Sequence, residues 1–192
     1  MTEDENNHYE SGIDEWRKLP VFRQGVVILH LVEHIIEGIK LEDNNPNSQY
    51  KKALYQRYTQ QMMDNAILIP SAIATAHGVD LYDLKMENAT VVRKAAREII
   101  QDSKGLLASG YKDVEYLDLL GDAIEMLRPI FARWVQTFDA TQYIIDRWGL
   151  FNPPGVNFDD PAQLKNIDPN TFLNNLDEDD EWEDSEDEGL KN

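Results

Sequence analysis

The sequence predicts an all-α fold, namely an antiparallel up-and-down four-helix bundle with a short C-terminal helical extension and a disordered acidic tail. Apolar residues recur at three- and four-residue spacing along four long segments between residues 20 and 138. Short breaks rich in polar residues or glycine separate these segments. The 192-residue chain has no cysteine, which excludes a disulfide framework and a thiolate metal site.

The negative charge is concentrated at the two ends of the chain. The net charge is −18, yet residues 16–158 hold 17 acidic and 16 basic residues and are close to neutral. Residues 159–192 hold thirteen acidic residues and two lysines. Such acidity argues against nucleic acid as a partner, because phosphates are repelled at long range. We therefore expect an acidic flexible N-terminus (1–15), a four-helix bundle (16–140), a short helical or irregular extension (141–176) and a disordered acidic tail (177–192).

The first helix is predicted from about Pro20 to Gly38. A proline suits the first helical turn, where its missing N–H costs nothing. The polar stretch Glu42–Ser48 then breaks the pattern. The residues expected on the buried side of this helix are Val21, Gly25, Ile28, Val32, Ile35, Ile36 and Ile39.

The second helix is predicted from about Gln49 to Ala76, with a proline in its middle. Either Pro70 kinks one continuous helix, or the helix ends near Ile69 and another begins. We favour the kink, because the apolar spacing continues across the proline. The hydroxyl of Ser71 can bond a carbonyl that the proline frees. The residues expected to form the kink and allow close helix packing are Pro70, Ser71, Ala72 and Ala74.

Two further helices complete the predicted bundle. The third begins near Leu81 or Asp83 and ends at Ser109, with Gly110 as its C-terminal cap. The fourth follows Asp113 and reaches Phe138, with a second bend at Pro129. Beyond it, residues 141–151 form either a fifth short helix or an extension of the fourth, and Asp-Pro pairs at 160–161 and 168–169 fit later helix starts.

His30 and His34 are the clearest candidate metal ligands. With Glu33 they spell H-x-x-E-H, in which positions i and i+4 of a helix bring both imidazoles to one side, as zinc needs. A helical wheel places both histidines opposite the apolar stripe, which favours an ordinary solvated face. Glu98 and Glu125, on neighbouring helices, are also expected at the surface. We expect no catalytic residue, no metal and no cofactor, and hence not an enzyme.

Arg93, Lys94 and Arg97 form a candidate basic docking strip on the third helix. Clustered surface charges are usually solubility features. The alternative is a strip that docks an acidic partner or the acidic tail of this chain. A smaller basic cluster starts the second helix, at Lys51, Lys52 and Arg57.

The acidic tail itself is a candidate binding segment for a protein partner. Ten of the twelve residues from Asp177 to Glu188 are acidic, and Trp182 lies among them. Phe172, Leu173 and Leu176 precede them. Apolar residues in such sequence often fold onto a partner's groove, while the alternative is a tail that only solubilises the chain.

The N-terminus and the apolar segments bear on location. Residues 1–15 are acidic and polar, unlike a signal peptide. No apolar run approaches the roughly 18 residues that a membrane span needs. We expect a cytoplasmic protein without a membrane partner.

The proline stretch also carries a family resemblance. Ile69, Pro70, Ser71, Ile73 and Ala74 match the Ser-Ile-Pro-x-x-Ile-Ala-Glu-Gly-like motif in the second helix of the four-helix-bundle proteins named for the 23S rRNA intervening sequence. The segment 108–111 (Ala-Ser-Gly-Tyr) stands where that family has a Leu-Gly-Tyr-like turn. From Leu19 to Phe138 the chain resembles this family in helix order and lengths, but Thr75 and Ala76 replace its Glu-Gly.

This resemblance implies a non-enzymatic scaffold protein that self-associates, with a ring-like homopentamer as the suggested form. The family includes relatives of the accessory protein of diversity-generating retroelements, which is basic and engages nucleic acid and a reverse transcriptase. An accessory protein with an RNA or reverse-transcriptase partner is therefore the alternative, and a metal-dependent enzyme is third. The near-neutral body argues against carrying nucleic-acid binding over.

Overall fold

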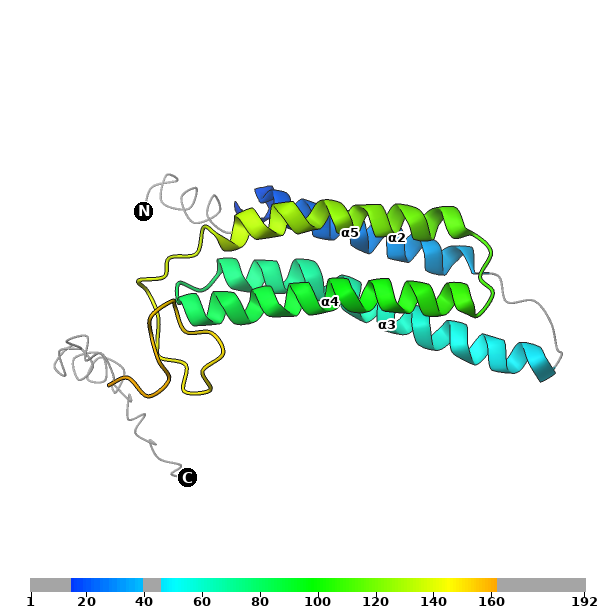
Figure 1. The fold of residues 1–192 in the computed structure, drawn as a ribbon. Helices are drawn as coiled ribbons and strands as arrows, with labels where there is room; N and C mark the ends of the chain where they lie inside the picture. Colours follow the sequence, from blue (N-terminus) through cyan, green and yellow to red (C-terminus); the bar gives the residue numbers. More distant parts are fainter. Residues whose placement is uncertain (1–14, 40–45, 162–192) are drawn as a thin grey trace, which may run out of the picture. The chain divides into compact units, whose positions relative to one another are not determined.

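The structure is a computed structural model that describes residues 15–39 and 46–161. Within these ranges the structure has four long α-helices and no strand (Figure 1). The all-α prediction is confirmed to that extent. The chain divides into two units, Met1–Phe158 and Asp159–Asn192, and the first contains every described helix. These are a 3-10 helix η1 (Glu15–Lys18) and the helices α2 (Pro20–Gly38), α3 (Pro46–His77), α4 (Tyr82–Ala108) and α5 (Val114–Val135).

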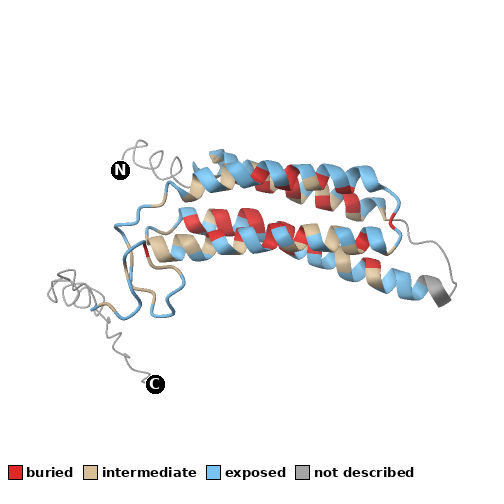
Figure 2. Cartoon of the chain, in the orientation of Figure 1, coloured by how far each residue is buried: buried red, intermediate tan, exposed pale blue. Residues whose placement is uncertain are grey.

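The four long helices share one apolar core but do not pack equally. Helix α2 lies against both α3 and α5, and α3 lies against α4, whereas α4 and α5 approach each other much less. Figure 2 shows the buried residues on the facing sides of the helices. Burying each large apolar side chain contributes about 1.5–3 kcal/mol. The largest fully buried side chains are Ile28, Ile35, Met62, Ile69, Ile73, Ile99, Leu106 and Leu120.

Helix α3 continues without interruption through Pro70, so the alternative of two separate helices is wrong. It also begins earlier than predicted, at Pro46 inside the expected polar break. Ser71 is exposed, and its Oγ donates a hydrogen bond to the carbonyl of Ile67 at 2.8 Å. Because Pro70 has no N–H, the carbonyl that loses its helical donor is that of Ala66. The serine therefore supports the adjacent turn and does not replace the missing bond.

The closest approach between α2 and α3 occurs at Gly25. A Cβ atom on this residue would lie 2.8 Å from Cγ2 of Ile69 and 3.5 Å from the nitrogen of Pro70. On the α3 side Ala72 is buried and Ala74 is half-buried. Small size is thus needed on α2, opposite the proline stretch. Close helix packing at Ala72 and Ala74 stays a prediction.

The segment after α5 is not helical, which corrects the helical extension expected over residues 141–151. Helix α5 ends at Val135, and turns follow. The Asp146 carboxylate accepts hydrogen bonds from the N–H groups of Trp148, Leu150 and Phe151 at 2.9, 2.8 and 2.9 Å. Desolvation works in the opposite direction, but these donors hold the pKa of Asp146 below its usual value. A side chain that bonds nearby N–H groups offers them an alternative to helical bonding. The rest of the expected extension and the acidic tail lie outside the described residues, as does the N-terminus before Glu15.

We expect Gly25→Ala to lower the free energy of unfolding by about 1–3 kcal/mol, because the added methyl group overpacks the contact with Ile69. Urea denaturation followed by circular dichroism measures this. The matched control is Gly121→Ala in α5, where a Cβ would meet no atom within 4 Å. That change should raise stability by about 1 kcal/mol through helix propensity. Equal effects of the two substitutions would contradict the close approach.

Candidate docking groove between α4 and α5

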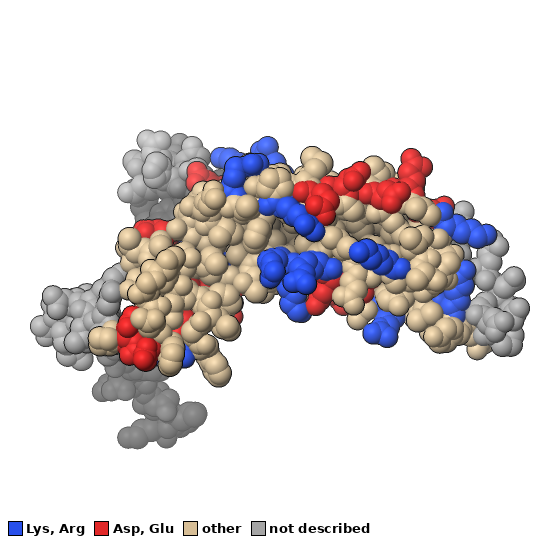
Figure 3. Space-filling model, in the orientation of Figure 1, with Lys and Arg blue, Asp and Glu red and all other residues tan. Residues whose placement is uncertain are grey.

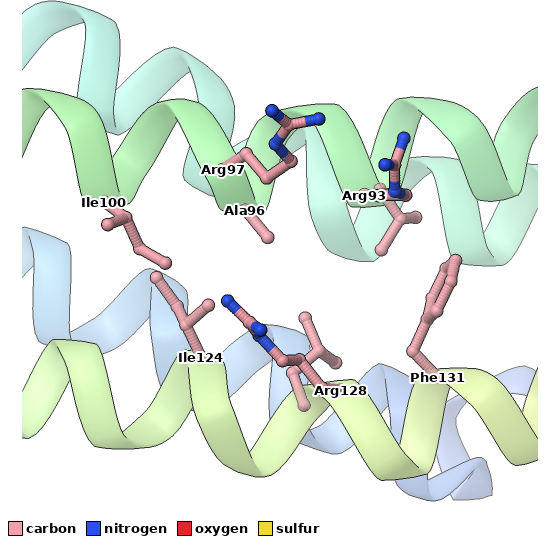
Figure 4. Close-up of a pocket in the computed structure, with 9 residues that line it drawn as sticks. Arg93, Ala96, Arg97, Ile100, Ile124, Arg128 and Phe131 are labelled. Carbon is pink, nitrogen blue, oxygen red and sulfur yellow. The ribbon is translucent and has the colours of Figure 1, made fainter.

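A groove of about 410 Å³ lies between α4 and α5, where these two helices fail to close on each other. Its volume falls in the range of ligand and side-chain binding sites. Figure 4 shows α4 along one wall and α5 along the other. Helix α4 contributes Val92, Arg93, Ala96, Arg97 and Ile100, and α5 contributes Ile124, Leu127, Arg128 and Phe131.

The floor of the groove is the apolar core itself. Val92, Ala96, Ile124 and Leu127 are buried core residues, since the apolar stripe of each helix faces inward. Phe131 is half-buried and stands at one end of the groove (Figure 4). An apolar side chain entering from outside would therefore meet core residues directly.

Three arginines form the rim of the groove. Arg93 and Arg97 are one helical turn apart on α4, and Arg128 reaches from α5 into the space between the helices (Figure 4). Arg128 pairs with Glu125 at 3.1 Å. Arg93 and Arg97 form no ion pair or hydrogen bond with any described residue. Their guanidinium groups are thus free to bind carboxylates. Figure 3 shows basic side chains gathered along this face.

The third residue of the predicted basic strip behaves differently. Lys94 forms an exposed ion pair with Glu98 at 3.1 Å and does not line the groove. Arg128 was not singled out from the sequence, because it is far from Arg93 along the chain. The one sequence feature that could have pointed to Arg128 is its position three residues before Phe131 in an apolar helical pattern.

Three exposed apolar side chains, Val27 on α2 and Leu119 and Met126 on α5, are together called the apolar ridge. These side chains are 46%, 46% and 60% exposed. Two contacts place α2 against α5. Gln24 Nε2 donates to the Ala123 carbonyl at 2.9 Å, and the rings of His34 and Tyr116 are 4.6 Å apart. Val27 lies between Gln24 and His34 in the sequence of α2. It is therefore level with the Leu119–Ala123 turn of α5. Acidic residues are exposed beside this ridge on α5, namely Glu115, Asp118 and Asp122.

The candidate metal ligands gain no third ligating residue among the described parts of the chain. His34 lies against Tyr116, and no cluster of three metal-ligating side chains occurs among the described residues. Glu98 and Glu125 each pair with a base on their own helix. In the second basic cluster, Lys51 Nζ donates to the Gly110 carbonyl at 3.4 Å.

A second cavity, the α3–α4 pocket, has a volume of about 570 Å³ and polar walls. Desolvation, with the nearby Glu98 carboxylate, raises the pKa of Asp102 in this pocket, and Arg57 opposes the shift. The pocket is lined by Arg57, Tyr58, Gln61, Asp64 and Asn65 from α3 and by Glu98, Gln101, Asp102 and Gly105 from α4.

Comparison with known proteins finds no relative. No family model, no curated protein and no solved structure matches the chain. Among the described helices, none is both long enough and apolar enough to cross a membrane.

We expect Asp102→Asn to stabilise the protein at neutral pH by a few tenths of a kcal/mol, since solvent screens a partly exposed carboxylate. The raised pKa means that folding disfavours the charged form. Well below the ordinary value of 3.8 both states are protonated, so the substitution should have no electrostatic effect there. The gain should appear as the pH rises through the raised pKa. Urea denaturation of both proteins between pH 3 and pH 7 measures it, and a gain that shrinks with rising pH would contradict it.

Proposed function

We propose that this chain is a non-enzymatic interaction protein that self-associates, built as an antiparallel up-and-down four-helix bundle of the 23S rRNA intervening-sequence type. The observation that carries the proposal is the groove between α4 and α5, whose floor is apolar and whose rim is basic. An exposed apolar ridge with acidic neighbours lies on another face of the same molecule. A second copy is therefore the proposed occupant of the groove.

The contacts between helices support the antiparallel arrangement. Along α2 and α5, Gln24 meets Ala123 whereas His34 meets Tyr116, so residue numbers rise in opposite directions. Lys51 near the start of α3 bonds Gly110 just after the end of α4. Short connections of four and five residues join α3 to α4 and α4 to α5, as expected for antiparallel neighbours.

The groove and the ridge complement each other in polarity and in charge. The apolar ridge would cover the apolar floor, and the carboxylates beside the ridge would meet Arg93, Arg97 and Arg128 at the rim. Because two different surfaces meet, the contact is heterologous, and such contacts produce rings when the rotation closes. A cytoplasmic homopentamer is the form that the family resemblance favours, with the acidic tail left to engage a further protein.

Two complementary variants test this proposal. Arg97→Glu reverses a charge at the rim of the groove and leaves the ridge unchanged. Met126→Glu places a charge on the ridge and leaves the groove unchanged. We expect the wild type to sediment as an oligomer, and each variant to raise the dissociation constant at least about tenfold, equivalent to about 1.4 kcal/mol. An equimolar mixture should form a heterodimer, because one intact groove and one intact ridge remain.

Analytical ultracentrifugation distinguishes the outcomes, and circular dichroism verifies that both exposed positions tolerate substitution. Glu87→Gln on α4, outside the groove, is the control and should assemble as the wild type does. A monomeric wild type would refute self-association. A mixture that stays monomeric would refute the pairing of groove with ridge.

The arginine rim favours a second candidate, a nucleic-acid-associated accessory protein. Three guanidinium groups in one groove could contact RNA phosphates. Single-stranded RNA retention at low salt tests this with the full chain, with Arg97→Glu and with a chain lacking residues 177–192. The RNA-binding candidate is supported if Arg97→Glu abolishes RNA retention and the deletion of residues 177–192 increases it. The third candidate, a metal enzyme, requires zinc binding that His34→Ala removes in calorimetry.

A further inference from the structure

The α3–α4 pocket contains a buried amide that the protein leaves without a partner. Asn65 is 9% exposed and is the one buried polar residue of the described core. Its side chain forms no hydrogen bond with any described residue. Fully enclosed side-chain nitrogen and oxygen atoms in the described part of the chain all have partners. The Asn65 amide must therefore reach the pocket that it lines, and it has donors and acceptors to offer there.

The charged groups of the pocket divide into paired and unpaired ones. Glu98 pairs with Lys94, and Asp64 accepts a hydrogen bond from Gln60 at 2.8 Å. Asp102 on α4 and Arg57 on α3 have no ion pair or hydrogen bond within the described residues, either with each other or with a third group. Arg57 is nevertheless close enough to lower the pKa of Asp102. One carboxylate and one guanidinium thus remain open in the same pocket, one on each wall.

We propose that the α3–α4 pocket binds a small zwitterion of the amino-acid class, with its carboxylate at Arg57, its ammonium group at Asp102 and its polar remainder at Asn65. Guanidinium groups bind carboxylates through two parallel hydrogen bonds, and an aspartate accepts from an ammonium group. A ligand with a single charge would leave either Arg57 or Asp102 without a partner.

The walls of the pocket suit a ligand of this size. The volume of about 570 Å³ lies within the range of small-molecule sites. Tyr58 lies over Gly105, where a Cβ atom would come within 2.5 Å of the tyrosine ring. Glycine thus lets the ring lie directly against α4, where it forms one side of the pocket. The amides of Gln61 and Gln101 add further hydrogen-bonding groups.

The proposal also accounts for two groups in one pocket that lack a protein partner. The Asn65 amide has no protein partner and reaches the pocket, and desolvation disfavours the charged form of Asp102. Unsatisfied or perturbed groups of this kind cluster where a ligand completes them. Two such groups on facing helices of one pocket are what a bound polar molecule would satisfy.

Isothermal titration calorimetry of the full-length protein in 150 mM NaCl tests the inference. The probes are glycine, L-glutamine and 4-aminobutanoate, which differ in length and in the separation of their charges. Propylamine and propionate are the singly charged controls. We expect at least one zwitterion to bind saturably at one site per chain, and both controls to bind at least about tenfold more weakly, because each lacks one charged hydrogen bond.

Substitutions then assign the roles. Arg57→Gln, Asp102→Asn and Asn65→Leu should each weaken zwitterion binding at least about tenfold. Arg133→Gln and Asp118→Asn, on exposed positions of α5, are the matched controls and should bind normally. Asp102→Asn should weaken binding although it does not destabilise the fold, which a purely structural role would not produce.

Three outcomes would overturn the inference. The first is that no zwitterion binds. The second is that propylamine binds as tightly as the zwitterion. The third is that Arg57→Gln and Asp102→Asn leave the affinity for the zwitterion unchanged. The second outcome would indicate only the attraction of cations to a chain of net charge −18. The site does not depend on self-association, so Arg97→Glu should bind the zwitterion normally even when it is monomeric.

Discussion

The close approach of α2 to α3 at Gly25 is the contact on which the rest of the structure depends. Helix α2 is the shared partner of α3 and α5, while α4 is held mainly through α3. Because Ile69 and Pro70 fit against a residue without a side chain, α2 can lie directly on α3 and close the core on that side. Helices α4 and α5 are each fixed to a different neighbour, and no packing forces them together. The groove follows from this unequal packing.

Helix positions were predictable from the sequence, because apolar spacing records which side of a helix is buried. The first helix runs from Pro20 to Gly38 as expected, and continuity through Pro70 followed from unbroken spacing. The turn around Asp146 was not predictable in this way. Its apolar residues suggested a helix, but one carboxylate binds three N–H groups that a helix would have used.

The candidate sites could be predicted only in part. Arg93 and Arg97 are visible as a pair on one helix, since their spacing is local. Arg128 joins them only because α5 lies across the groove from α4, and no local pattern contains that information. The burial of Asn65 was equally unpredictable from the sequence, because a polar residue in a helical pattern is usually exposed. Its burial results from the way α3 and α4 pack against each other.

Helix α4 lines both the groove and the α3–α4 pocket, and its charges are divided between the two faces. At 100° per residue, Arg93 and Arg97 fall on the side toward α5, and Asp102 falls on the opposite side, toward the α3–α4 pocket. The Lys94–Glu98 pair lies between them and holds its charges at the surface. Asn65 and Asp102 line the same pocket from α3 and α4, and neither side chain forms a hydrogen bond or ion pair with a described residue. The zwitterion proposed for this pocket would bind both.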